Sequence, residues 1–264
     1  MKIIILSFAD AWEMLLEWAL PKRISDFVEA TTDREEPEPL LTQLWFPVIA
    51  AGGGLIVIIF AALLSNLATV SAGLIFAFVM TLLSELRDKG HATGTLASFS
   101  ILKANGHSLP ETIFNLDADL RTVNGAIGAM VLTLTVILKF SCFFLMSFYG
   151  FAFWIIPTLV LGYAMQAELA TLPTVRSGEP FIKIADNQRF YVWGITTFFI
   201  LFILLKAPIL ALISLGTVFV AAMLVKRFED EQLGGITGNA ITLIGYLTEL
   251  AVLTLGAVCL SGSA

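Results

Sequence analysis

Long apolar runs are the feature that most constrains this chain. Seven runs can be read, at 44–64, 67–84, 125–147, 151–166, 190–205, 207–225 and 240–262. A helix needs about 20 consecutive apolar residues to cross the hydrocarbon core of a membrane. Because lipid offers no hydrogen-bond partner to the backbone, such runs fold as helices. The sequence therefore predicts an all-α fold, a polytopic integral membrane helix bundle with about seven transmembrane helices.

The composition supports a membrane protein over a soluble one. The 264 residues are 58% hydrophobic and 14% charged, and the mean hydropathy is +0.89. Soluble domains are about 45–50% apolar and about 25% charged. The net charge of −6 argues against a nucleic-acid partner. The composition thus predicts the lipid bilayer as a partner, and a homo-oligomer or a larger membrane complex both stay open.

The links between the runs alternate between tight turns and long polar segments. The long segments are 1–43, 85–124, 167–189 and 226–239. The alternation places all four on one side of the membrane, and they hold every basic residue except Lys139 and Lys206. An excess of Lys and Arg marks the cytoplasmic side. We therefore expect a single membrane domain over 1–264, with the long loop 85–124 and the two shorter loops, 167–189 and 226–239, facing the cytoplasm.

The segment 1–43 has two parts. Within its first 20 residues, Asp10, Glu13 and Glu17 follow the i, i+3, i+7 spacing and share one helical face. This pattern predicts an amphipathic helix that is interfacial or re-entrant, followed by an acidic linker. The acidic stripe fits the wetted face of such a helix, with a cation site as the alternative. A cleaved signal peptide is not indicated, because no small-residue cleavage pattern follows the apolar start.

Two ionisable residues, Lys139 and Glu249, lie inside apolar runs. Counted along their helices, they lie at depths that differ by about one turn. A charge in hydrocarbon costs roughly 3 kcal/mol or more unless it is paired, so it usually faces the bundle interior. Two interpretations stay open. The residues form one buried ion pair that locks two helices, or they form the polar floor of a substrate cavity.

A glycine-rich turn leads into the last apolar run, with the sequence Gly234-Gly235-Ile236-Thr237-Gly238-Asn239. Thr237 and Asn239 are good N-cap residues, and the N–H groups at a helix N-terminus favour anions such as phosphate. Glycine also lets a ligand approach the backbone closely. The pattern fits a phosphate site, and it equally fits a simple turn before a membrane helix.

The loop 85–124 collects carboxylates, at Glu85, Asp88, Asp117 and Asp119. Carboxylate oxygens together with water are the ligands that Mg²⁺ uses in proteins. The two histidines of this loop are too widely spaced to be typical of a zinc site. The loop is therefore a candidate magnesium site, with a solvated loop as the alternative.

Several segments carry a resemblance to a known family. They are Phe46-Pro47 with the glycine-rich run after it, Asp119-Leu120-Arg121 with Gly125, Gly128 and Lys139, Arg176-Ser177-Gly178, Lys226-Arg227, the turn 234–239, and Glu249-Leu250. In this order they resemble the cobalamin synthase family, adenosylcobinamide-GDP ribazoletransferase. The segment that corresponds to the family's aspartate-rich stretch is 93–100, and it contains no carboxylate. The chain therefore resembles a divergent member.

The resemblance implies a magnesium-dependent transferase of cobalamin biosynthesis, located in a bacterial or archaeal cytoplasmic membrane. Such an enzyme joins the phosphate of a nucleotide-activated corrinoid to ribazole or ribazole phosphate and releases GMP. By resemblance, Asp119 and Arg121 are catalytic residues. The candidate magnesium ligands are the loop carboxylates Asp117, Asp119, Asp88 and Glu85, which would replace the missing aspartate-rich stretch. The implied phosphate-binding residues are Arg176, Lys183, Gly234, Gly235, Thr237, Gly238 and Asn239.

Two further functions stay open. The first is a catalytically degenerate or repurposed family member that binds a corrinoid, a nucleotide or a membrane partner. The second, a solute transporter, is less favoured, because the sequence shows no inverted repeat or broken helix at the membrane midplane.

Overall fold

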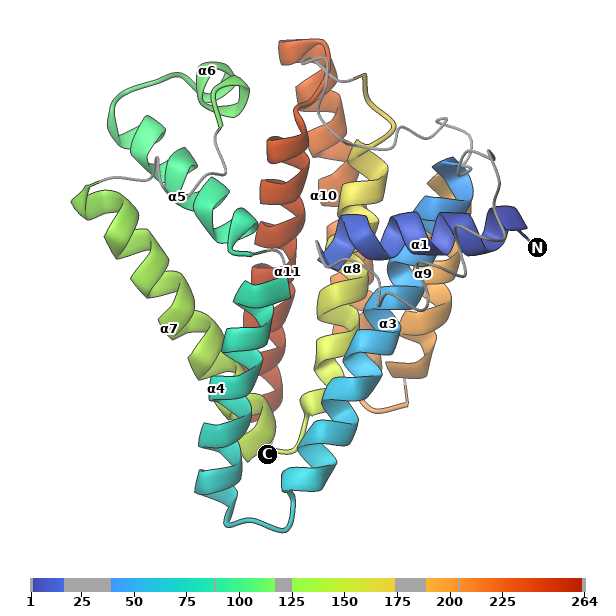
Figure 1. Ribbon diagram of the computed structural model, residues 1–264, viewed down its shortest axis with the longest axis vertical. Helices are drawn as coiled ribbons and strands as arrows, with labels where there is room; N and C mark the ends of the chain where they lie inside the picture. The colour runs from blue at the N-terminus through green and yellow to red at the C-terminus, as the bar shows by residue number, and fades with distance from the viewer. Residues whose placement is uncertain are drawn as a thin grey trace.

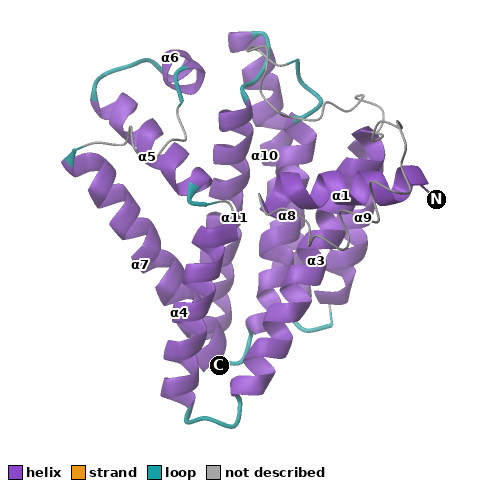
Figure 2. Ribbon diagram, viewed as in Figure 1, coloured by secondary structure: helices purple, strands orange, loops and turns teal. Residues whose placement is uncertain are grey.

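The computed structural model describes residues 2–16, 39–87, 89–116, 125–173, 189–203 and 205–262. Within these ranges the protein is helical and has no β-strand (Figure 2). Six of the described helices are long and apolar enough to cross a membrane. They are α3 (Pro39–Leu64), α4 (Thr69–Arg87), α7 (Ala126–Phe148), α8 (Ile155–Leu169, preceded by the 3-10 turn Ala152–Trp154), α10 (Pro208–Leu233) and α11 (Gly238–Ser261). The chain is thus a helical integral membrane protein, as its apolar runs predict.

Four further helices complete the described structure. They are α1 (Lys2–Leu16), α5 (His91–Ala104), α6 (Leu109–Phe114) and α9 (Arg189–Ile203). The fifth predicted span corresponds to α9, which has 15 described residues. A spanning helix needs at least about 17 residues. That α9 is a seventh membrane-spanning helix therefore stays a prediction.

The membrane-length helices run roughly side by side, whereas α1 lies across the bundle (Figure 1). The tight turns that follow α3, α7 and α9 lie at one end of the bundle in Figure 1. The short helices α5 and α6 and the connection from α10 to α11 lie at the opposite end (Figure 1). This arrangement agrees with the alternation of short and long links. Which end faces the cytoplasm stays a prediction.

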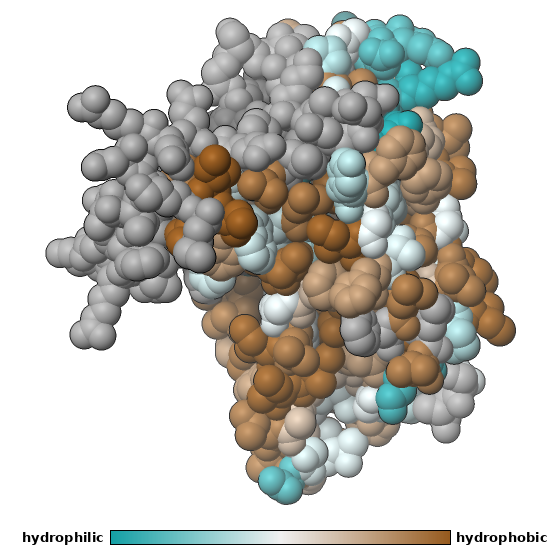
Figure 3. Space-filling model, turned by 90° about the vertical axis from the view of Figure 1, so that its right-hand side faces the viewer, coloured by the Kyte–Doolittle hydropathy of each residue, from teal (hydrophilic) through white to brown (hydrophobic). Residues whose placement is uncertain are grey.

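Helix α8 forms the centre of the bundle, where it packs against α3, α9, α10 and α11. Trp154, fully buried just before α8, donates a hydrogen bond from Nε1 to the Val252 carbonyl oxygen of α11 (2.8 Å). A Cβ atom at Gly256 would overlap the Trp154 ring, so glycine is required for this close approach. The outer helices instead expose apolar side chains, which cover most of the described surface in Figure 3. Such a surface fits contact with lipid.

The chain changes direction sharply between α4 and α5. Lys89 and Gly90 both adopt positive φ angles, 53° and 77°. The Gly90 N–H donates to the Glu85 carbonyl oxygen (2.8 Å), which ends α4 in the manner of a helix C-cap. Helix α5 then packs against α7 and α11 through small buried residues such as Ala92, Gly94 and Ala97. The segment 85–124, expected as a long loop, is therefore largely helical where it is described.

Candidate functional site

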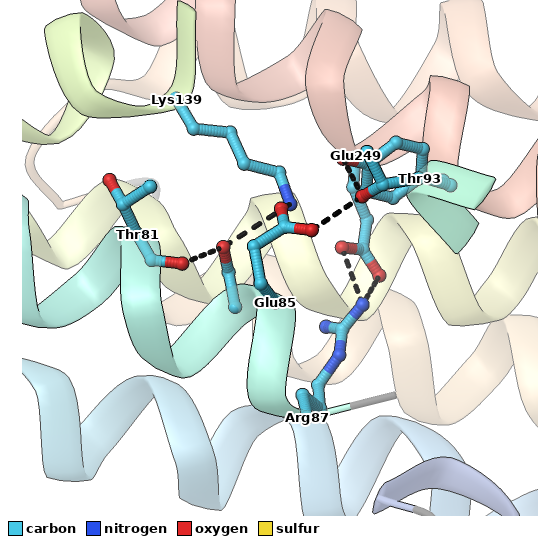
Figure 4. A network of polar contacts seen from close by, with 8 residues as sticks. Thr81, Glu85, Arg87, Thr93, Lys139 and Glu249 are labelled. Atoms are coloured by element: carbon cyan, nitrogen blue, oxygen red, sulfur yellow. Dashed lines mark hydrogen bonds and ion pairs between the residues drawn. The ribbon is translucent and has the colours of Figure 1, made fainter. Parts of the chain in front are cut away.

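Two ion pairs lie next to each other at the C-terminal end of α4 (Figure 4). The ammonium Nζ of Lys139, on α7, lies 2.5 Å from Oε1 of Glu85. The Arg87 guanidinium reaches both carboxylate oxygens of Glu249, on α11, with Nη2 at 3.2 Å from Oε1 and 3.0 Å from Oε2. The pairs therefore connect α4 to two other membrane helices.

Neutral hydroxyl groups complete this arrangement. Thr93, on α5, donates a hydrogen bond from Oγ1 to Oε2 of Glu85 (2.7 Å). Since a hydroxyl has only one proton, the 3.0 Å contact between Thr93 Oγ1 and Tyr246 Oη must have Tyr246 as donor. Lys139 Nζ also donates to Ser84 Oγ (3.2 Å) and lies 4.5 Å from the centre of the Tyr246 ring. We call these residues the polar cluster: Ser84, Glu85, Arg87, Thr93, Lys139, Tyr246 and Glu249.

Close helix packing holds the Arg87–Glu249 pair in place. A Cβ atom at Gly162, on α8, would overlap Cγ of Glu249, so the absence of a side chain at 162 makes room for the carboxylate. The Arg87 guanidinium lies 5.5 Å from the centre of the Tyr163 ring, also on α8. A cation over an aromatic face is attracted to it. The pair is therefore fixed by α8 as well as by the two helices that carry it.

The structure gives Lys139 and Glu249 different partners from the one expected. The direct Lys139–Glu249 ion pair does not form, because Lys139 is bound by Glu85 and Glu249 by Arg87. Both residues are buried, at 4% and 8% exposure. Both also line a cavity. Such a position is what the second interpretation, a polar floor of a substrate cavity, requires.

This cavity, which we call the α3–α4 cavity, has a volume of about 550 Å³. Its walls come from α1, α3, α4, α7, α8 and α11, and most of the lining side chains are apolar. Polar lining comes mainly from the polar cluster, through Ser84, Arg87, Lys139, Tyr246 and Glu249. Cavities of about 300–1,000 Å³ with an apolar wall and a few polar groups are typical of small-molecule sites.

The glycine-rich turn is tightly held by the protein itself. The N–H groups of Gly234, Gly235 and Ile236 donate to the carbonyl oxygens of Asp230, Glu229 and Pro173 (3.2, 3.4 and 2.9 Å). These three N–H groups are therefore occupied within the protein.

The second half of the turn starts α11. Thr237 is the N-cap of α11 and accepts a hydrogen bond from the Ala240 N–H (3.2 Å). Gly238 is the first helical residue. Asn239 donates from Nδ2 to the Leu116 carbonyl oxygen (3.0 Å), and its Oδ1 lies 3.2 Å from Nε2 of His91. The turn therefore lies beside the start of α5.

The remaining predicted site residues lie outside the described part of the chain. They are Asp88, Asp117, Asp119, Arg121, Arg176 and Lys183. Of the predicted magnesium ligands, Glu85 is described, and its two oxygens contact Lys139 and Thr93. Among the described residues there is no group of three or more His, Cys, Asp or Glu that could hold a metal ion. The magnesium site therefore stays a prediction.

The sequence interpretation missed two features. It did not identify Arg87 as a partner of the intramembrane Glu249, although Arg87 follows the second apolar run directly. It also missed Glu168 of α8, which is 1% exposed. Glu168 accepts hydrogen bonds from Arg189 Nη1 and Trp193 Nε1 of α9 (both 2.8 Å), and Lys226 Nζ of α10 lies 3.8 Å away. The only signal in the sequence is a single acid just after the apolar run 151–166. The length of the run does not show whether such an acid lies in the helix or in the following loop.

The chain matches no protein-family model, no curated protein and no solved structure. The assignment of a function therefore depends on the residues and their geometry.

Proposed function

We propose that this protein is a membrane transferase resembling adenosylcobinamide-GDP ribazoletransferase. Convergence of separated segments supports the proposal. The segments on which the resemblance depends include Lys139, 234–239 and Glu249, which are far apart in the sequence. Lys139 and Glu249 both belong to the polar cluster and line the α3–α4 cavity, and Asn239 of the turn contacts His91, two residues before Thr93 of that cluster.

The proposed reaction transfers a phosphate-linked group between two oxygens. The ribazole hydroxyl oxygen attacks the phosphorus attached to cobinamide, the bond from that phosphorus to the bridging oxygen breaks, and GMP leaves with that oxygen. The hydroxyl proton passes to solvent or to a carboxylate. Such transfer depends on positive charge and hydrogen-bond donors around the phosphates. We assign phosphate contacts to Arg121, Arg176 and Lys183, and magnesium to Asp88, Asp117 and Asp119, as the resemblance implies.

The test is release of GMP by the purified full-length protein in lipid nanodiscs. The assay supplies adenosylcobinamide-GDP, α-ribazole phosphate and magnesium, with a related active enzyme as positive control. We expect release that a chelator abolishes and that Asp119→Ala abolishes. The matched control is Asp230→Ala, which removes an exposed acid on α10 and is expected to leave GMP release unchanged. No GMP from a folded sample would contradict the transferase proposal.

A second candidate is a protein that binds the activated corrinoid without reacting with it. The engagement of both oxygens of Glu85 and of Glu249 by neighbouring side chains favours this candidate. Equilibrium dialysis of adenosylcobinamide-GDP against the same nanodiscs separates the two. Binding without GMP release supports the second candidate, and binding with release supports the first.

A further inference from the structure

The α3–α4 cavity lies where two neighbouring membrane helices separate. Helices α3 and α4 meet at the turn 65–68 and diverge from it in Figure 1. Helix α3 packs mainly on α8, and α4 mainly on α7, so neither fills the space between them. Gly52 and Gly53 of α3 line this space, and a Cβ atom built at either would have no other heavy atom within 4 Å. The cavity is therefore left open by the choice of small residues on its wall.

The cavity opens toward the side of the bundle that faces lipid. Ile56 of α3 and Leu83 of α4 both line it, and they are 68% and 42% exposed. Both residues lie in helices that are long and apolar enough to span the membrane. Large exposed apolar side chains on a membrane-spanning helix face hydrocarbon. The opening between α3 and α4 is thus accessible from within the bilayer.

Hydrogen-bonding groups lie at one end of the cavity. Trp12 of α1 lines the cavity, and its buried Nε1–H has no hydrogen-bond partner. Its neighbour Ala11 packs in one hydrophobic cluster with Tyr163, whose ring lies under the Arg87 guanidinium. Trp12 is therefore at the same end as the Arg87–Glu249 pair. A donor that is buried without an acceptor is costly unless a ligand satisfies it.

We propose that the α3–α4 cavity binds the hydrocarbon chain of a membrane lipid, which enters between α3 and α4. The polar group of the lipid lies beside Trp12 and the Arg87–Glu249 pair. Apolar walls without a filling molecule lose their dispersion contacts, and water is a poor filler of an apolar space. In the bilayer, the molecules present at the opening are lipid chains. This inference needs no nucleotide or corrinoid, so it stands or falls independently of the proposed transferase.

Photo-crosslinking tests the proposal on the full-length protein. The probe is a phosphatidylcholine with a diazirine in one acyl chain, incorporated into phosphatidylcholine nanodiscs, and adducts are mapped by mass spectrometry. Met80 and Phe143 line the cavity and are only 7% and 3% exposed, so lipid around the bundle does not reach them. We expect adducts on both, in addition to adducts on Val220 of α10, which is 56% exposed.

Filling the cavity provides the matched comparison. Gly53→Phe places a ring in the open space, and we expect it to abolish adducts on Met80 and Phe143 while adducts on Val220 persist. The control is Gly216→Phe on α10, where a Cβ atom also has no other heavy atom within 4 Å, and it should retain the wild-type pattern. If Gly53→Phe does not fold, Gly52→Leu replaces it.

Two outcomes would overturn the proposal. One is a wild-type protein whose Val220 is labelled and whose Met80 and Phe143 are not, which would mean that water or another molecule fills the cavity. The other is labelling of Met80 and Phe143 that persists in a folded cavity-filling variant. Neither outcome involves GMP release, so failure here is distinguishable from failure of the transferase assay.

Discussion

Two of the buried carboxylate centres in the described part of the chain differ in their surroundings. At Glu168, one carboxylate joins α8 to α9 and α10, its side chain is 0% exposed, and Arg189 and Trp193 occupy its two oxygens. In the polar cluster, the Arg87 and Glu249 side chains are 18% and 10% exposed, and both line the α3–α4 cavity. Glu168 is not among the residues that line this cavity.

The difference teaches what a buried charge does in this fold. A carboxylate that is enclosed by partners from two neighbouring helices and does not line the α3–α4 cavity contributes to the bundle's geometry. A charge that faces a cavity keeps the same kind of partner but is in reach of a ligand. Buried ion pairs are weak indicators of stability by themselves. The presence of a cavity beside the buried charge, more than the way the charge is paired, therefore distinguishes a candidate site from a structural centre.

The largest expected effect is the loss of stability when the Glu168 centre, which we call the sealed centre, is removed. Glu168→Ala leaves Arg189, Lys226 and the Trp193 N–H without their shared acceptor. Removing one partner of a buried pair costs about 3–5 kcal/mol of the free energy of unfolding. Chemical unfolding in lipid-detergent micelles measures this loss. Glu231→Ala is the matched control, because Glu231 pairs with Arg227 on the exposed surface of α10 and its loss should leave stability nearly unchanged. Equal stability of the two variants would remove the structural role of Glu168.

A smaller effect is expected in the polar cluster, and a double-mutant cycle isolates it. Arg87→Met removes the guanidinium that contacts both oxygens of Glu249 and should cost about 2–3 kcal/mol, less than the loss of a fully buried pair. The double variant with Glu249→Met should recover most of this loss, because an apolar pair replaces an ion pair without an orphan charge.

The same cycle at the sealed centre sharpens the comparison. Combining Glu168→Met with Arg189→Met should not restore stability, because the Trp193 N–H and Lys226 still lose their acceptor. Recovery at both centres would show that the two are energetically alike, and the distinction between them would then be wrong.

Much of the fold follows from the sequence, because apolar runs of membrane length leave helices as the only solution. The boundaries of α7 and α11 agree with the runs 125–147 and 240–262 to within two residues. Helix α5 was missed because its 14 residues have no strong apolar periodicity and form a buried helix through packing of small side chains on α7 and α11. Local sequence carries little information about such tertiary contacts.

Only part of the candidate site could be predicted, because its other residues depend on tertiary contacts. Lys139 and Glu249 could be identified, because an ionisable residue in an apolar run is visible in the sequence. Their partners could not, since Glu85 and Arg87 lie at the end of a run, and the tilt and rotation of α4 decide where their side chains point. The α3–α4 cavity arises from the divergence of two helices, which no local pattern encodes.

The smallest expected effect concerns an exposed carboxylate, which provides the reference for the two buried centres. Glu111 closes a capping box at the start of α6, where its Oε2 accepts from the Ser108 N–H (2.9 Å) and the Ser108 hydroxyl accepts from the Glu111 N–H (3.4 Å). The bond from the Ser108 N–H is the main cause that lowers the pKa of Glu111 below its ordinary value of 4.5, and the Ser108 hydroxyl and His107 add to it.

Because the folded pKa of Glu111 is lowered, its capping contribution is fully present above pH 4.5 and is lost as the pH falls through the folded value. The ¹³C shift of the Glu111 carboxyl, followed by NMR in nanodiscs, should therefore titrate with a midpoint below 4.5. Amide exchange at Glu111 and Thr112 should rise over the same pH range, while global unfolding stays unaffected by this group. A midpoint at or above 4.5 would mean that the capping box does not favour the charged form of Glu111.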